Sequence, residues 1–176
     1  ISPVLITGLI NGTPYFVRLR AVTNVGASLS SESVLAVPIS IPFAPTGLTA
    51  TPSNGQISIS FIPGFDGGKP IIGYQYSINN GFFVSATTEN PLVIASSTNP
   101  IVIKDLDNGT SYSIMLRAIN SIGASLASNA VSEIPMTIPS APIISQSTIT
   151  TSNHKITIPF TAGFNGGREI TSYEYS

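Results

Sequence analysis

The chain has 176 residues, of which 42% are hydrophobic and only 9% are charged, with a formal net charge of −1 and no cysteine. The apolar content is enough for packed cores and excludes a disordered chain, whereas the small net charge excludes an electrostatic surface for nucleic acid or an anionic membrane. The lack of cysteine excludes thiol nucleophiles, thiolate metal sites and disulfides, and no apolar run reaches the roughly 18 residues of a membrane span.

A long internal repeat organises the chain. Residues 9–38 match residues 106–135 at an offset of 97, so that Leu9 corresponds to Leu106. Residues 60–68 match residues 159–167 at an offset of 99, so the third copy carries two extra residues, which we place near 145–154. Two long matches at nearly one period predict an array of similar units.

Residues 1–38 correspond to the last part of one such unit. The first nine residues have the character of mid-domain sequence, so we expect the ends of the chain to be fragment boundaries. Prolines punctuate the linker over residues 39–45 and recur over residues 135–142. Proline fixes its own φ and restricts the residue before it, so both linkers should be short, extended and semi-rigid.

Residues 43–136 form a complete unit in which apolar and polar residues alternate. Such a period of two predicts half-buried strands. We expect these strands over residues 56–61, 71–77, 100–104, 111–120 and 124–134. The inward-facing residues of this unit are expected to be Ile57, Ile59, Phe61, Tyr74, Tyr76, Ile101, Ile103, Tyr112, Ile114, Leu116 and Ala118.

Turn residues separate these strands. Asn79-Asn80-Gly81 predicts a hairpin turn from which residues 82–86 pair back, because Asn and Gly tolerate positive φ. Residues 139–176 correspond to the opening part of a third unit. Short strands at regular spacing, with no convincing helical period between them, predict an all-β sandwich.

The segment Leu-Asp-Asn-Gly-Thr-Ser-Tyr at 106–112 resembles the L-x-x-G-T-x-Y segment of fibronectin type III domains, and residues 9–15 repeat it. Residues 67–74 are similar to the B–C loop and strand C of that family. The resemblance covers essentially the whole chain. It implies an all-β fold of tandem fibronectin-type-III-like (immunoglobulin-like) β-sandwiches, one complete and two partial. Residues 1–38 are then strands E–G of one module and residues 139–176 strands A–C of another.

One departure from the family lies in strand B, where a Trp is usual. Phe61 and Phe160 stand in that place. Phenylalanine keeps most of the apolar burial but lacks the indole N–H, so we expect the fold to survive.

The resemblance also implies a tyrosine corner in each copy, in which the tyrosine hydroxyl bonds to the backbone upstream. The residues concerned are Tyr15, Tyr112, Leu9, Leu106, Gly12 and Gly109. A second candidate is an outward face of strand F, formed by Phe16, Arg18, Arg20 and Arg117. An arginine and aromatic face suits a protein or glycan partner, although cross-strand packing on a solvated face is the plainer interpretation.

Other residues have chemistry of their own but lack partners for it. His154 belongs to an expected turn, and the Asp105 and Asp107 pair is not repeated, because the first copy has Gly8 and Ile10 there. The glycine pairs at 67–68 and 166–167 fit tight loops better than a phosphate site. Asn-Gly-Thr at 11–13 and 108–110 fits a glycosylation acceptor, although turn formation is the plainer cause. The sequence predicts no catalytic residue, metal site or cofactor.

These features lead to the hypothesis of a non-catalytic spacer and adhesion-type repeat in a large filament or fibre protein. The repeats are similar to modules of long bacterial surface and secreted proteins and of virion fibres, so we expect an extracellular, cell-surface or virion-surface location. The alternative is an accessory module of a secreted polysaccharide-degrading enzyme. A third possibility is partner binding by strand addition, including self-association in which the end segments of adjacent chains share one sandwich.

Overall fold

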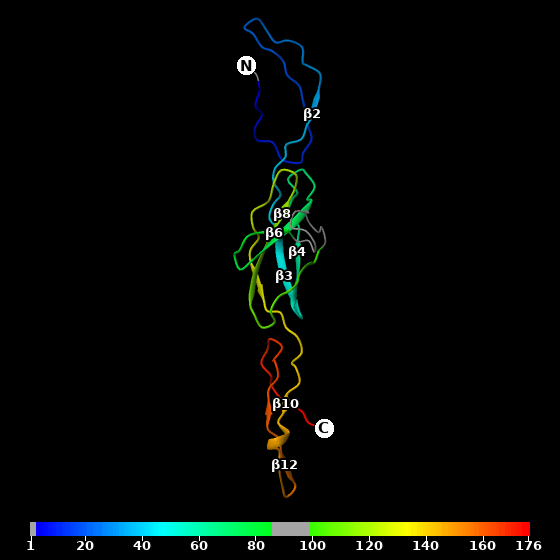
Figure 1. Ribbon diagram of the computed structural model, residues 1–176. Helices are drawn as coiled ribbons and strands as arrows, with labels where there is room; N and C mark the ends of the chain where they lie inside the picture. Colours follow the sequence, from blue (N-terminus) through cyan, green and yellow to red (C-terminus); the bar gives the residue numbers. More distant parts are fainter. Residues whose placement is uncertain (1–2, 86–98) are drawn as a thin grey trace.

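The computed structural model describes residues 3–85 and 99–176. We refer to residues 43–136 as the central domain, residues 3–38 as the N-terminal segment and residues 139–176 as the C-terminal segment. Figure 1 shows these three parts following one another along a single long axis. Within the described residues, no helix is long and apolar enough to cross a membrane.

The central domain is a sandwich of two antiparallel sheets, which confirms the predicted all-β fold class. One sheet has the strand order β3-β4-β7 and the other has the order β6-β5-β8-β9. The strands of the first sheet are β3 (Thr46–Ser53), β4 (Gln56–Ile62) and β7 (Ile101–Ile103). Those of the second are β5 (Gly73–Ile78), β6 (Val84–Ser85), β8 (Tyr112–Ile119) and β9 (Val131–Glu133).

Alternation in β4 and β8 builds the core between the sheets. Along β4, Ile57 and Ile59 are completely buried while Ser60 is exposed. The predicted inward faces of both strands are confirmed. The buried hydrophobic core consists of Ile57, Ile59, Phe61, Tyr74, Ile101, Ile103, Ile114, Leu116 and Ala118.

Phe61 fills the position at which the family usually has tryptophan. Its ring packs edge-on against Tyr74, with 4.6 Å between ring centroids and 63° between ring planes. Phe160 and Tyr173 form the same pair in the C-terminal segment, at 4.4 Å and 60°. The aromatic contact therefore recurs without an indole.

The hairpin between β5 and β6 forms as the turn residues predict. Asn79 and Asn80 adopt positive φ angles of 51° and 60°, and the backbone N–H of Gly81 donates to the carbonyl of Ile78 at 2.9 Å. The returning strand is β6. The expected strand residue Ala86 lies outside the described residues.

The predicted strand over residues 124–134 forms only near its end, because serine side chains replace the regular ladder over residues 124–130. Beyond one isolated bridge at Ala124, a strand forms only at β9. Ser128 donates its backbone N–H to the carbonyl of Leu116 at 2.8 Å, and its Oγ accepts the N–H of Leu116 at 2.9 Å. Ser125 does the same with Ala118, at 2.8 and 2.9 Å.

The N-terminal segment repeats this serine pattern. Ser28 donates its backbone N–H to the carbonyl of Ala21 and accepts the N–H of Ala21 with its Oγ, and Ser31 forms the same two bonds with Leu19. The distances are 2.8 to 3.0 Å. Its two strands, β1 (Tyr15–Val17) and β2 (Val34–Ala36), pair antiparallel. No strand precedes β1 among residues 3–14, although the family resemblance implies strand E there.

The C-terminal segment contains two short antiparallel pairs. The first joins β10 (Ile143–Ile144) to β13 (Phe160–Thr161), and the second joins β11 (Thr150–Ser152) to β12 (Lys155–Thr157). A 3-10 turn, η1 (Gln146–Thr148), lies where we placed the two extra residues. Residues 170–176 form no strand, since β5 of the central domain is held by β8 and this segment has no counterpart of β8.

Candidate functional site

Tyr15 and Tyr112 close the turns that precede β1 and β8. Oη of Tyr112 accepts a hydrogen bond from the backbone N–H of Asp107 at 3.0 Å. Oη of Tyr15 accepts one from the backbone N–H of Ile10, also at 3.0 Å. Each bond spans five residues, so it holds the intervening Asn-Gly turn in a fixed shape.

The other residues of the two tyrosine segments support the same turns. Leu106 packs against the buried core of the central domain, and Leu9 is half-buried. Gly12 and Gly109 have φ angles of 79° and 87°, a region that favours glycine. The structure therefore brings the six residues of the tyrosine-corner expectation into two equivalent turns.

Asn108 has a role that the sequence interpretation missed. Its Oδ1 accepts the backbone N–H of Gly55 at 2.9 Å, and its Nδ2 donates to Oδ1 of Asn54 at 2.7 Å. The side chain thus ties the β3–β4 turn to the turn before β8. Its side-chain amide is engaged in two hydrogen bonds within the fold.

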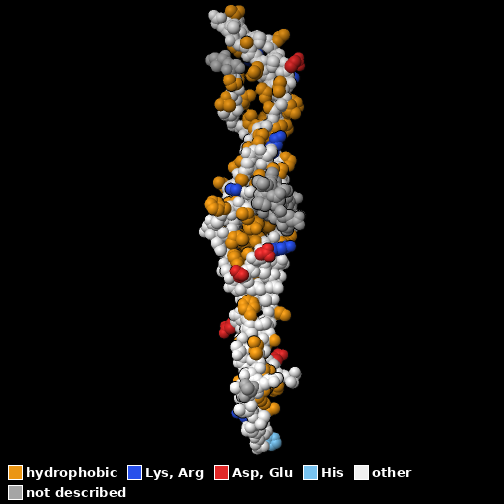
Figure 2. Space-filling model, viewed as in Figure 1, with side chains coloured by type: hydrophobic (Ala, Val, Ile, Leu, Met, Phe, Trp, Pro, Cys, Tyr) orange, Lys and Arg blue, Asp and Glu red, His pale blue; other side chains and the backbone are white. Residues whose placement is uncertain are grey.

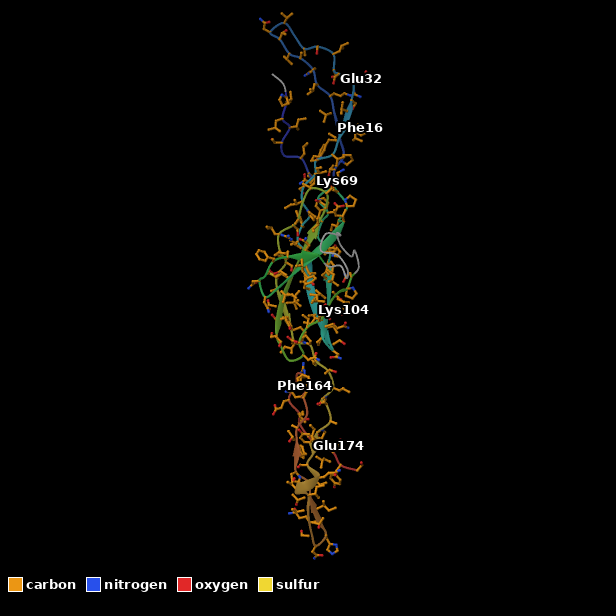
Figure 3. All side chains as sticks on the ribbon, viewed as in Figure 1. Phe16, Glu32, Lys69, Lys104, Phe164 and Glu174 are labelled. Atoms are coloured by element: carbon orange, nitrogen blue, oxygen red, sulfur yellow. The ribbon has the colours of Figure 1, made fainter. Side chains whose placement is uncertain are left out.

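The outward face expected on strand F divides into two unlike parts. Phe16, Arg18 and Arg20 are exposed on the N-terminal segment, where Figure 3 labels Phe16 beside β2. On the face that Figure 2 shows, hydrophobic side chains gather on this segment and few charged ones are visible along the molecule. At an offset of 97, the positions of Phe16 and Arg18 hold Ser113 and Met115.

Arg117, the fourth member of that face, packs within the central domain. Its Nε donates to Oε1 of Gln75 at 2.7 Å. Its guanidinium carbon lies 4.4 Å from the ring centroid of Phe83. This is the cross-strand packing that the plainer interpretation of the face predicts.

The joint between the N-terminal segment and the central domain is built from backbone groups. Three hydrogen bonds of 2.8 Å fasten the linker on both sides: Gly12 N to Pro38 O, Ser40 N to Gly67 O, and Phe43 N to Phe65 O. The linker is therefore bonded to the Asn-Gly turn that precedes it and to the Gly-Gly loop that follows it.

Two glycines meet at the centre of this joint. A Cβ placed on Gly68 would lie 2.6 Å from the backbone nitrogen of Gly12 and 2.7 Å from its Cα, and Gly68 has a φ of 82°. A Cβ at 2.6 Å from backbone is a steric overlap. The close approach of the turn and the loop therefore requires glycine.

The joint between the central domain and the C-terminal segment repeats this arrangement. The equivalent bonds are Gly109 N to Pro135 O at 2.9 Å, Thr137 N to Gly166 O at 2.8 Å, and Ser140 N to Phe164 O at 2.9 Å. A Cβ on Gly167 would again lie 2.6 Å from the nitrogen of the opposing glycine, Gly109. Figure 3 labels Lys69 next to the first joint and Phe164 next to the second.

Each joint also has contacts of its own. At the first, Asn120 is only 2% exposed and its Nδ2 donates to the carbonyls of Ser40 and Asp66, both at 2.8 Å. At the second, Nε of Arg168 donates to Sδ of Met136 at 3.0 Å. Side chains thus add to a backbone arrangement that both joints share.

An open groove of about 620 Å³ lies beside the first joint. Its walls come from both sides of the joint, and the rings of Phe43 and Phe65 meet edge-on in it, with 5.7 Å between centroids. Ser140 occupies the position of Phe43 in the second joint, so the aromatic wall is not repeated.

The sequence singled out the glycines of the joints but assigned them to separate turns and loops. The missing information was spatial, namely that the turn of one copy meets the loop of the next. The signal was the recurrence of glycine at both places in successive copies. His154 lies in the β11–β12 turn with a φ of 58°, and the described residues include no group of three or more His, Cys, Asp or Glu side chains that would hold a metal ion.

Comparisons with known proteins agree with this architecture. The family model described as the fibronectin type III domain matches residues 43–134. The Kelch domain-containing protein SSO1033 of Saccharolobus solfataricus is 25% identical over 128 residues, which cover 71% of this chain and 17% of that protein. Fibronectin type-III domain-containing protein 3A of Mus musculus is 30% identical over 129 residues, which cover 66% of this chain and 10% of that protein.

The chain therefore spans less than a fifth of the length of either relative. Among solved structures, domains d3–d4 of the rat CD45 extracellular region align with a TM-score of 0.54 and 15% sequence identity. The alignment covers 76% of this chain and 70% of that one. At this identity the likeness concerns the fold alone, an immunoglobulin-like sandwich.

Proposed function

Because the chain belongs to the fibronectin type III domain family, we propose that it is a non-catalytic spacer and adhesion-type repeat region of a large extracellular or surface filament protein. The observation that supports this most directly is the pair of matching joints. A chain of domains whose linkers are hydrogen-bonded on both sides keeps its ends apart, which is what a spacer must do.

We also propose that residues 1–38 and 139–176 are parts of further modules like the central domain. The serine bonds of Ser28 and Ser31 support this for the N-terminal segment, and the Phe160–Tyr173 pair supports it for the C-terminal segment. Sequencing the parent gene on either side should reveal further copies at a spacing near 97 to 99 residues. Unrelated sequence on both sides would contradict the array.

Small-angle X-ray scattering tests the spacer function. The 176-residue chain should have a pair-distance distribution with a long tail, as an elongated particle has. A longer chain with added modules should increase its maximum dimension in proportion to the number of modules. A compact particle whose maximum dimension does not grow would overturn the proposal.

Antibody labelling of the source organism tests the proposed location. Antibodies against the central domain should label intact cells or particles without lysis. Labelling that appears only after lysis would contradict a surface location. A parent gene that encodes a polysaccharide-degrading catalytic domain next to these copies would favour the accessory-module alternative, and an uninterrupted array of the repeats would argue against it.

The exposed face formed by Phe16, Arg18 and Arg20 is the candidate binding surface for a protein or glycan partner. A glycan array with the whole chain provides the probe, and alanine at Phe16 and Arg18 should remove any binding that this face supports. Arg117→Ala is the control, since that side chain is occupied by Gln75 and Phe83. Equal loss in both variants would argue against this face.

A further inference from the structure

We propose that the two ends of this module recognise each other: the Gly-Gly loop of one copy is a docking surface whose partner is the Asn-Gly turn of the preceding copy. This surface fixes successive modules in one orientation. The inference rests on the proposed spacer function and states how the spacer is held straight. We call the Asn-Gly turns at 11–12 and 108–109 the turn end, and the glycine pairs at 67–68 and 166–167 the loop end.

Recurrence of the contact is the first argument. At both joints a Cβ on the loop glycine, Gly68 or Gly167, would lie 2.6 Å from the backbone nitrogen of the opposing turn glycine, Gly12 or Gly109. The neighbouring side chains differ, with Phe43 at one joint and Ser140 at the other. The shared geometry therefore depends on the glycines and the backbone, and less on the variable side chains.

The bonding of both ends to one linker is the second argument. The turn end presents a backbone N–H from Gly12 or Gly109, and that N–H is bonded to the last proline of its own module, Pro38 or Pro135. The loop end presents a carbonyl, from Gly67 or Gly166, that accepts the linker N–H two residues after that proline. One short linker thus forms hydrogen bonds with both ends. These bonds restrict rotation of one module relative to the next.

The central domain carries both ends on opposite sides, as Figure 1 shows from the two segments that adjoin it. An interface between unlike surfaces of one repeated unit propagates without closing when the two surfaces face apart. Each module then contacts only its two neighbours, so its stability includes one coupling contribution from each joint. The recognised partner is another copy of the same module.

Distance measurements between spin labels across the first joint test this inference. The chain has no cysteine, so Ser33→Cys and Ser60→Cys, both exposed in the parent, give one label on each side. The parent should show a single narrow distance distribution. Gly68→Ala should broaden or shift it, because the added methyl group overlaps the backbone of Gly12.

Gly55→Ala is the matched control, since Gly55 has a φ of 63° but its Cβ would come no nearer than 3.5 Å to a neighbour. This variant has the same cost of a positive φ angle but lies away from the first joint, so it should leave the distance distribution narrow. If Gly68→Ala prevents folding, Gly12→Ala approaches the same contact from the other side. Gly8→Ala then serves as control, with a φ of 77° and open space around it.

The two proposals fail in different ways. A broad distribution in the parent, or a narrow and unshifted one in both Gly68→Ala and Gly12→Ala, overturns end-to-end recognition while an elongated scattering profile leaves the spacer function standing. A compact scattering profile overturns the spacer function itself. A narrow parent distribution that the joint variants lose, with both controls unchanged, supports the recognition surface.

Discussion

The hydroxyl group of Tyr112 shows how one atom holds a turn in this molecule. Its bond to the N–H of Asp107 spans a turn that also contains Asn108 and Gly109. Asn108 ties that turn to the β3–β4 hairpin, and Gly109 brings it to the next module. A small group of polar atoms therefore links the core, the hairpin and the joint.

Removing the hydroxyl with Tyr112→Phe should lower the free energy of unfolding by about 1 kcal/mol, the usual net value of one hydrogen bond. Urea unfolding followed by circular dichroism measures the change. Tyr175→Phe is the control, because that side chain is 98% exposed. Equal stability of Tyr112→Phe and the parent would show that the bond contributes nothing in solution.

Buried tyrosines set an alkaline limit on stability. Burial raises the pKa of Tyr74 and that of Tyr76 above the ordinary value of 10.0. Below that value both states hold the proton and stability is complete. Above it the unfolded state loses the proton first, so stability falls as the pH rises toward the raised folded pKa.

Urea midpoints should therefore fall as the pH rises from about 9 to about 11.5, across the ordinary tyrosine pKa. Tyr74→Phe should weaken this fall, and Tyr175→Phe should not. A fall of the same size in Tyr74→Phe would assign the alkaline limit to other groups.

At the residue scale, the sequence predicted the tyrosines because a family motif surrounds them. It did not predict the partners of Asn108 or Asn120. An Asn-Gly pair is sufficiently explained by a turn. Nothing in the local sequence indicates that the side-chain amide of Asn108 also bonds to Asn54, in a hairpin fifty-four residues away.

Among the strands, β4 and β8 were predicted well because their alternation continues over a whole strand and one face is buried. The segment before β9 was not, since its residues look like a strand while its hydrogen bonds come from side chains. Ser125 and Ser128 use Oγ where a ladder would use a carbonyl, and each Oγ donates to the carbonyl of the next residue, at 2.7 and 2.8 Å.

Ser128→Ala should therefore cost about 1–3 kcal/mol, because it leaves the completely buried N–H of Leu116 without its acceptor. Thermal and urea unfolding both measure the loss. Ser132→Ala, at an exposed position of β9, is the matched control and should change stability little. If Ser128→Ala left the free energy of unfolding unchanged, a water molecule would have to replace the hydroxyl as acceptor.

The whole molecule is held in line by uncharged groups. The shared bonds of both joints run between backbone atoms, and only 9% of the residues are charged. The sequence predicted the proline linkers as semi-rigid from their composition. It could not predict the joints, because the contact between copies depends on the distance between surfaces and not on any local pattern.

The elongated shape should therefore be insensitive to salt. Raising ionic strength from about 0.1 M to about 1 M shortens the Debye length from about 10 Å to about 3 Å, which weakens exposed charge interactions and leaves these joints intact. The maximum dimension from X-ray scattering should stay constant over that range. A marked contraction at high salt would reveal charge repulsion as the cause of extension.

The serines beside β8 have one more consequence, which concerns strand exchange between neighbouring copies during folding. Neighbouring copies are close in sequence and tethered at high local concentration, which favours exchange of strands between them. An open sheet edge is the usual template for that exchange. Here the carbonyls of Leu126 and Asn129 already accept the hydroxyls of Ser125 and Ser128, so we expect this border of the sheet to bind a strand from a neighbouring copy less readily.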